Sequence, residues 1–427
     1  MLRYLLPLNG LAPVAFLALL IQSPDPAHAA GVVTSLREAE SFSLERDSRL
    51  AQIEATRAAH EERNVTSGQL PDPRLRFGAL NLPVDSFELD QEPMTQLLVG
   101  LSQSFPPGRT LALRSASQAS QAAAQAEMLA ERRRMIRRQV RLLWTDIAQL
   151  QDAARIVERK QQWYRELEDA VTASYSSGAR GQHDVVRARL ERRLLGDRLL
   201  NLEGEIANRI AQLSRWTGAA PVDGMAIRIP VLPAPEDYET ALQSIERHPL
   251  LRASASAVEV RELGEELARE RYKPSFGVDV AYGFRSGEDA SGDERPDFFS
   301  AMLNFSLPVL SGRRQDRDLA AAQAERRAAR EAEIDRRREL VAQLDSLWAG
   351  LTELEARDSL FQSDVLPDAN TNVEATRAAY QNDYASFAEL VGAQTLLLTQ
   401  ELSYLSLRAD LARNRARLLY LTEEESQ

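Results

Sequence analysis

A long stretch without helix breakers constrains this chain more than any other feature. Residues 110–175 contain neither proline nor glycine. Apolar residues recur there at alternating spacings of four and three: Ile136, Val140, Leu143, Ile147, Leu150, Ala154 and Val157. This spacing is typical of a coiled-coil seam. A helix over the range is roughly 100 Å long at 1.5 Å per residue, which suits an extended molecule better than a compact globule.

A second stretch, residues 315–366, repeats the pattern. Its leucines again alternate between spacings of four and three: Leu340, Leu344, Leu347, Leu351 and Leu354. Charged residues fill the positions between the seams, including the run 131–134, Glu-Arg-Arg-Arg. Such a run is typical of a solvated helix face, with binding to an anionic surface as the alternative.

The chain is internally duplicated. The matching positions are Gly108-Arg109 with Gly312-Arg313, Tyr175 with Tyr380, and Pro73 with Pro274. Their separation stays between 201 and 205 residues. One unit therefore contains a helix, two short strands, a long helix, a turn and another long helix, and it occurs twice.

The strands are expected over about 73–82, 96–106, 274–285 and 298–309, where apolar and polar or small residues alternate. Their lengths suit tilted transmembrane strands. The segments between paired strands are acidic, as expected for a water-exposed hairpin end. The alternative is two ordinary hairpins packed on a soluble core.

Four strands cannot close a barrel with a usable lumen, and open strand edges are not tolerated in lipid. The pattern therefore favours an oligomer, and three copies would supply twelve strands. The predicted fold class is mainly α with a small β contribution. Each copy would contribute long coiled-coil helices and two pairs of transmembrane strands.

Composition excludes several function classes. The net charge of -11 argues against a nucleic-acid partner, which requires positive charge. The absence of cysteine excludes thiolate metal sites, a cysteine nucleophile, disulfides and a lipid anchor on cysteine. The four histidines show no metal-ligand spacing, and no catalytic triad or nucleotide-binding loop is present. We expect no enzyme, no cofactor and no metal site.

The first 29 residues resemble a secretory signal peptide. A positive charge at Arg3 precedes an apolar run over 11–21 and the small-residue site Ala27-His28-Ala29. A single N-terminal membrane anchor is the alternative. The mature chain is then exported and divides into a first repeat (30–214), a linker region (215–250) and a second repeat (251–427). The long helices are expected at about 109–175, 183–214, 313–379 and 386–422.

With these features in place, the chain resembles the TolC-like outer membrane efflux protein family. The resemblance rests on the duplication, on Leu70-Pro71-Asp72-Pro73, on the segment 102–105 leading into Gly108-Arg109, and on the two tyrosine-centred turns. It implies a homotrimeric outer membrane channel of a Gram-negative bacterium. In such a trimer a 12-stranded β-barrel crosses the membrane and a periplasmic α-helical barrel forms the large periplasmic part. It also implies two protein partners, a periplasmic adaptor and a proton-driven inner-membrane transporter. Residues 30–45 and 215–250 would form an equatorial belt.

The same resemblance places a gate at the helical tips. In the family, the second tip carries a tyrosine, a glycine, a basic residue and two acids. Tyr380 and Glu389 match, whereas Asp383, Ala385 and Gly392 replace the other three.

The first tip keeps Tyr175, Gly178 and Asp184, with Arg180 and Arg187 nearby. An Arg–Asp contact between the tips is an alternative closure. The two tyrosines could instead simply pack their turns. Asp184 and Glu389 could form rings of charge around a threefold axis or be ordinary surface residues.

The junction residues Gly108, Arg109, Gly312 and Arg313 lie where a strand leads into a helix. A structural role is expected, with phosphate binding as the alternative. The segments 81–83 and 94–96 look most like the heavy-metal cation branch of the family. Channels for drugs or for type I protein secretion are alternatives within the class, and an exported coiled-coil scaffold is the alternative outside it.

Overall fold

The computed structural model describes residues 33–221, 224–235 and 237–423. The predicted signal peptide lies outside the described residues. The elements are α1 (Leu36–Arg46), α2 (Ser48–Ser67), β1 (Arg74–Leu80), β2 (Gln96–Phe105), α3 (Thr110–Ser176), α4 (Gln182–Thr217), α5 (Tyr238–Glu246), α6 (Pro249–Glu270), β3 (Ser275–Phe284), β4 (Phe298–Ser306), α7 (Gln315–Leu360), a π-helical turn (Phe361–Val365), α8 (Leu366–Gln381) and α9 (Phe387–Thr422). Among these helices, none has an apolar stretch long enough to cross a membrane.

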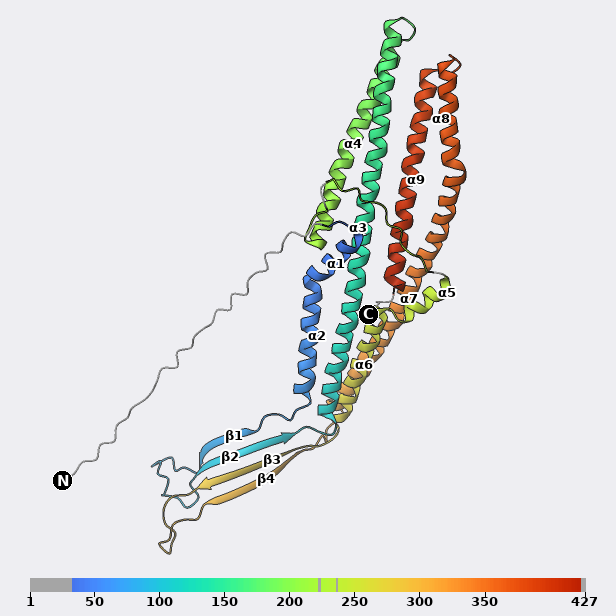
Figure 1. The fold of residues 1–427 in the computed structure, drawn as a ribbon. Helices are drawn as coiled ribbons and strands as arrows, with labels where there is room; N and C mark the ends of the chain where they lie inside the picture. The colour runs from blue at the N-terminus through green and yellow to red at the C-terminus, as the bar shows by residue number, and fades with distance from the viewer. Residues whose placement is uncertain (1–32, 222–223, 236, 424–427) are drawn as a thin grey trace, which may run out of the picture.

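The molecule is elongated, with the sheet at one end and two helical hairpins at the other (Figure 1). Helix α3 runs from the sheet to the far tip, where it turns back into α4. Helices α8 and α9 form the second hairpin beside it. The expected fold class, mainly helical with a four-stranded antiparallel sheet, is confirmed.

The duplication is visible in the order of elements. Helices α1 and α2 precede the first strand pair, and α5 and α6 precede the second. Their caps correspond as well, because Ser35 and Asp237 both accept hydrogen bonds at the start of the first helix of each pair. Helix α5 lies inside the range 215–250 that the sequence suggests as a linker, and it is the counterpart of α1.

The four strands form one antiparallel sheet in the order β1-β2-β3-β4. Pairing brings Val99 opposite Tyr282, and Phe276 opposite Phe305. The register places most of the large apolar side chains of the four strands on one face, since successive residues of a strand point to opposite faces. The exceptions, on the other face, are Leu80, Leu98, Phe298 and Met302. The apolar face is solvent-exposed in the single chain, as Phe77 and Phe299, both 72% exposed, illustrate.

The second long helix departs from the expected 313–379. A π-helical turn at Phe361–Val365 separates α7 from α8. Pro367 lies two residues after the end of this turn. A proline has no N–H to donate, and its ring crowds the carbonyl group four residues earlier. The wider turn accommodates this proline where α7 passes into α8.

The principal core lies at mid-height, where α1, the end of α4 and the segment after it pack on α3. Ile136, Val140 and Ile147 of the predicted seam are fully buried there. Leu150, also in the predicted seam, is only half-buried. A second cluster joins α3, α4 and α9 nearer the tips. The helical hairpins are thus packed on one another along most of their length.

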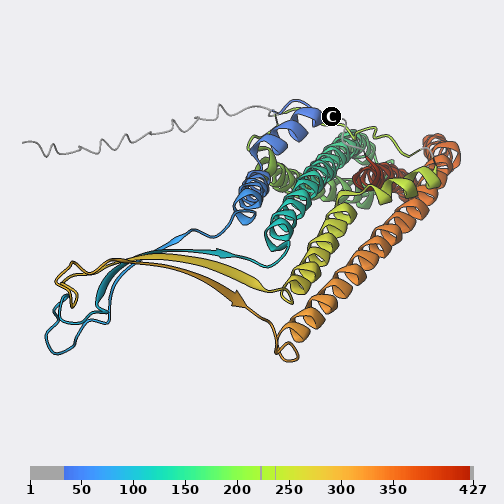
Figure 2. The same cartoon turned by 90° about the horizontal axis from the view of Figure 1, so that it is seen from below.

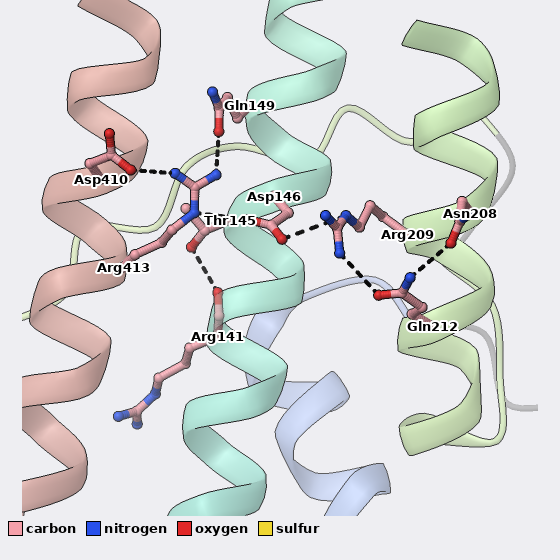
Figure 3. Close-up of polar contacts among 9 residues, drawn as sticks. All are labelled: Arg141, Thr145, Asp146, Gln149, Asn208, Arg209, Gln212, Asp410 and Arg413. Atoms are coloured by element: carbon pink, nitrogen blue, oxygen red, sulfur yellow. Dashed lines mark hydrogen bonds and ion pairs between the residues drawn. The ribbon is translucent and has the colours of Figure 1, made fainter. Parts of the chain in front are cut away.

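Polar side chains also join three helices at mid-height (Figure 3). Asp146 on α3 accepts a hydrogen bond from Arg413 Nε on α9 at 2.8 Å and lies 3.7 Å from Arg209 Nε on α4. Arg413 also donates to Gln149 and to Asp410. Asp146 therefore sits between two arginines from different helices.

The charged run 131–134 lies within helix contacts. Arg132 pairs with Asp47 at 2.6 Å, and Glu131 accepts a hydrogen bond from Tyr420 at 3.0 Å. Arg134 is 8% exposed. Arg133 is exposed, as expected for a solvated face, whereas Glu131 and Arg132 join α3 to α9 and to the N-cap of α2. The sequence alone could not indicate these partners, which are distant along the chain.

Arg141 makes a comparable junction. Its guanidinium pairs with Glu40 of α1 at 2.7 Å and with Glu423, just after α9, at 2.8 Å. The arginine side chain is 10% exposed and that of Glu40 18%. One arginine thus ties segments from both ends of the described chain to the middle of α3.

We expect Arg141→Gln to lower the free energy of unfolding by about 3 kcal/mol, because two shielded carboxylates lose their counter-charge. The change is measured as the midpoint of urea unfolding, followed by helical circular dichroism in detergent. Arg357→Gln, which breaks the exposed pair with Glu353, is the control and should cost less than about 0.5 kcal/mol. Equal effects of the two substitutions would contradict the assignment.

Candidate functional site: the helical tips and the strand-to-helix junctions

The two tip turns have the same backbone design. After α3, Ala179 N donates to Ser174 O at 2.9 Å, and after α8, Tyr384 N donates to Ala379 O at 2.8 Å. Each turn has one residue in the left-handed region, Gly178 with φ 79° and Asp383 with φ 58°. This is the usual way to end a helix, and aspartate is among the few other residues that tolerate the conformation. The duplication therefore extends to the turns.

A charged contact joins the two tips. Arg180 Nη2 in the first turn donates to Asp383 Oδ1 in the second at 2.7 Å. The same guanidinium lies over the Tyr380 ring, 4.6 Å from its centroid. An Arg–Asp contact between the tips, one of the closures that the sequence allows, is thus present within a single chain.

The two tip tyrosines differ in their surroundings. Tyr380 packs against the apolar cluster of α3, α4 and α9, and its ring lies 6.2 Å from that of Phe387. Tyr175 is 46% exposed. Tyr380 therefore packs its turn against the helices, whereas the side chain of Tyr175 faces solvent in the single chain.

Glu389 takes part in a helix cap. Ser386 Oγ accepts from Glu389 N at 3.2 Å, while a Glu389 oxygen accepts from Ser386 N at 2.6 Å. These bonds from Ser386 lower the pKa of the Glu389 carboxyl group, so the cap is kept at neutral pH and lost as the pH falls through that lowered pKa. The Ser-x-x-Glu spacing was a readable signal for this capping box.

Asp184 lies in the first turn of α4 and is 8% exposed. Its Oδ1 is 3.2 Å from His183 Nε2. A carboxylate here also faces the partial positive charge of a helix N-terminus. The structure thus brings Arg180, Tyr380 and Asp383 together, while Asp184 and Glu389 each sit at the start of their own helix.

The first junction is held by α6. Gly108 has φ 51°, and a Cβ atom there would collide with the carboxylate of Glu270. That carboxylate accepts a hydrogen bond from Arg109 N at 3.0 Å, and the Arg109 guanidinium pairs with Glu266 at 3.0 Å. The place where a phosphate could approach is therefore filled by a carboxylate, which supports a structural role.

The second junction is built differently. Gly312 does not have a positive φ, and a Cβ atom there would make only an ordinary contact with Asp316 at 3.9 Å. Arg313 is exposed, and within the described ranges it forms no ion pair. The two Gly-Arg pairs are alike in sequence but not in contacts. Glu270 and Glu266 were missed because they lie more than 150 residues from Arg109, and no local pattern marks them.

No group of three or more histidine or acidic side chains in the described ranges is arranged to hold a metal ion. Residues 241–422 match the family model described as "Outer membrane efflux protein". No curated protein sequence matches the chain. The match to a channel family confirms the prediction that the chain is not an enzyme.

Solved structures resemble nearly the whole chain. The CusC structure, described in terms of transmembrane channel formation, has a TM-score of 0.74 at 15% identity and covers 91% of both chains. The outer membrane protein VceC of Vibrio cholerae has a TM-score of 0.75 at 16% identity, covering 91% of this chain and 95% of that one. The open state of the MtrE outer membrane channel of Neisseria gonorrhoeae gives 0.75 at 13%, with 91% and 89% covered. This chain thus matches the outer membrane efflux proteins in sequence over residues 241–422 and has the fold of outer membrane channels over 91% of its length.

Proposed function

We propose that the chain is the outer membrane exit channel of a tripartite efflux system, through which small substrates pass passively. The main support is a four-stranded sheet with an exposed apolar face. This sheet is attached to one end of a helical layer whose central helix, α3, spans roughly 100 Å. Such a face suits lipid, and such a helix suits the periplasm. The family match over residues 241–422 supports this proposal.

The working unit is proposed as a homotrimer. Strands β1 and β4 each have an edge that no other strand of the described chain covers, and three copies would join these edges into a closed wall of twelve strands. The helical layer offers complementary edges as well. Val186, Leu190 and Leu194 form an exposed stripe on α4, while α8 and α9 carry a groove of about 520 Å³ lined by small residues such as Ala379 and Gly392. Helices α4 and α8 lie at opposite sides of the layer (Figures 1 and 2).

The six tip residues are proposed as the periplasmic entrance: Tyr175, Gly178, Asp184, Tyr380, Asp383 and Glu389. In the resting chain, the Arg180–Asp383 contact holds the two hairpin ends together. A periplasmic adaptor would link the channel to a proton-driven transporter. Docking of this adaptor would separate the two hairpin ends. Glu389 is the exposed acid that could contribute to a ring of charge around the threefold axis.

The cargo is proposed to be heavy-metal cations, on the resemblance of the segments 81–83 and 94–96 to that branch. Drug export and type I protein secretion are the other candidates. A coiled-coil scaffold outside the membrane would leave the apolar face of the sheet in water, which opposes that alternative.

We expect the full-length protein to be found in outer membrane fractions as a trimer that dissociates only on heating in detergent. Electrophoresis of unheated and heated samples, together with cross-linking, measures this. A monomer in the soluble periplasmic fraction would contradict the channel proposal and favour the scaffold.

Deletion of the gene is expected to cause hypersensitivity to a subset of copper, silver, zinc, cobalt and cadmium salts. Growth is compared across these salts and across a panel of drugs and detergents. Sensitivity to drugs or detergents with normal metal tolerance would contradict the metal proposal and leave the channel proposal intact. A plasmid copy of the gene serves as the complementation control.

Arg180→Gln is expected to loosen the tips, because it removes both the ion pair with Asp383 and the contact with the Tyr380 ring. Hydrogen exchange in residues 377–386 should rise about two- to tenfold, the range for a partly exposed contact of about 0.5–1.4 kcal/mol. Arg189→Gln is the matched control, since its partner Glu168 belongs to the same hairpin. If exchange at 377–386 is unchanged in Arg180→Gln, the contact does not hold the tips.

A further inference from the structure

The polar face of the sheet carries an unequal set of charges. The strand register places Arg74, Arg76 and Asp279 on the face opposite most of the large apolar residues. The other residues of that face within the four strands are uncharged, and many are glycine, alanine or serine. Each copy of the sheet therefore carries two arginines against one aspartate.

The aspartate is the shielded member of this set. Arg76 Nη2 donates to Asp279 Oδ1 at 3.0 Å, and Asn304 on β4 donates to the other carboxylate oxygen. The side chain of Asp279 is 12% exposed, whereas that of Arg76 is 49% exposed. The negative charge is thus enclosed by its partners, and positive charge faces the solvent.

The sequence of β2 makes this contact possible. Arg76 on β1 must reach across β2 to meet Asp279 on β3. On that face of β2 the intervening residues are Gly100, paired with Arg76, and Ser102, paired with Asp279. Both are small, so the arginine side chain can lie over the strand. Arg74 forms no ion pair with any described residue and adds a second guanidinium group two positions before Arg76.

We propose that Arg74 and Arg76 form a cationic ring on the inner wall of the closed sheet, where multivalent phosphate- or sulfate-bearing solutes bind. This inference rests on the proposed function, because only a closed trimer with its apolar face toward lipid turns the polar face toward a lumen. Three copies place six arginines and three shielded aspartates at the helix-proximal end of the strands. Six guanidinium groups against three carboxylates leave an excess of positive charge at one level of the pore, which attracts multivalent anions.

The ring has a defined physical signature. Its attraction acts over a Debye length of about 10 Å at 0.1 M salt and about 3 Å at 1 M. Binding should therefore weaken steeply as salt is added. A cationic ring disfavours free metal cations at this level of the pore, so strong block by an anion would favour anionic or complexed cargo over the free cations proposed above.

The test is block of single pores by inositol hexakisphosphate. Full-length protein is reconstituted in planar bilayers of phosphatidylcholine in 0.1 M KCl, and the probe is added to each compartment in turn. Arg74→Gln/Arg76→Gln is expected to raise the half-blocking concentration about fivefold or more, as is 1 M KCl acting on the unmodified protein. Arg357→Gln removes the same charge on α7, far from the sheet, and should leave block unchanged.

Arg74→Gln alone keeps the test decisive if the double variant fails to assemble, because it breaks no ion pair of the described chain. It should shift block in the same direction by a smaller factor. Pores blocked equally in all variants would overturn the ring while leaving the channel intact. A protein that forms no conducting pore would overturn the proposed function, and the ring with it.

Discussion

The two open edges of the sheet are the constraint on which the rest of the molecule depends. Backbone N–H and C=O groups that find no partner in lipid cost several kcal/mol each. The described chain pairs its strands only with one another and leaves β1 and β4 with one free edge apiece. One chain cannot close a sheet that has an apolar face and an open edge at each side, at β1 and at β4. In the proposed trimer, other copies supply the missing pairs, and the helices attached to each strand then stand side by side as well.

Arginine supplies much of the bracing between the helices. The long helices share a narrow apolar seam, with alanine and valine at many of its positions, so side chains at its margins contribute to alignment. Arg132, Arg141 and Arg413 each reach from one helix to a carboxylate on another. The planar guanidinium group can serve two or more acceptors at once, as Arg141 and Arg413 do. These pairs are partly shielded, so they fix the relative position of helices more strongly than exposed pairs would.

Most of the fold could be predicted from the duplication and from the alternation in the strands, because both are regular patterns that can be read directly along the sequence. The π-helical turn was not predicted, although Pro367 was a signal. Extending the leucine spacing from Leu354 puts Asp368 and Asn372 in the seam, whereas the structure buries Ala369 and Val373, one residue later. One extra residue in the wide turn accounts for that shift. At the tips, the duplication predicted where the tyrosines and charged residues lie in each turn. It could not predict that Arg180 pairs with Asp383, because that contact depends on tertiary packing. Glu270, set against Gly108, had no sequence signal at all.

Helix α3 makes its mid-height contacts near its own middle, so a rigid tilt about that point would work as a lever. The contacts of Arg141 and Asp146 lie about halfway between Thr110 and Ser176, leaving arms of roughly 50 Å on each side at 1.5 Å per residue. A tilt of two degrees about that point moves each end by about 2 Å, and the two ends move in opposite directions. Such a tilt would carry a movement of the tips to the strand end without any change in the helix itself. The displacement at one end would then equal that at the other, because the two arms are of nearly equal length.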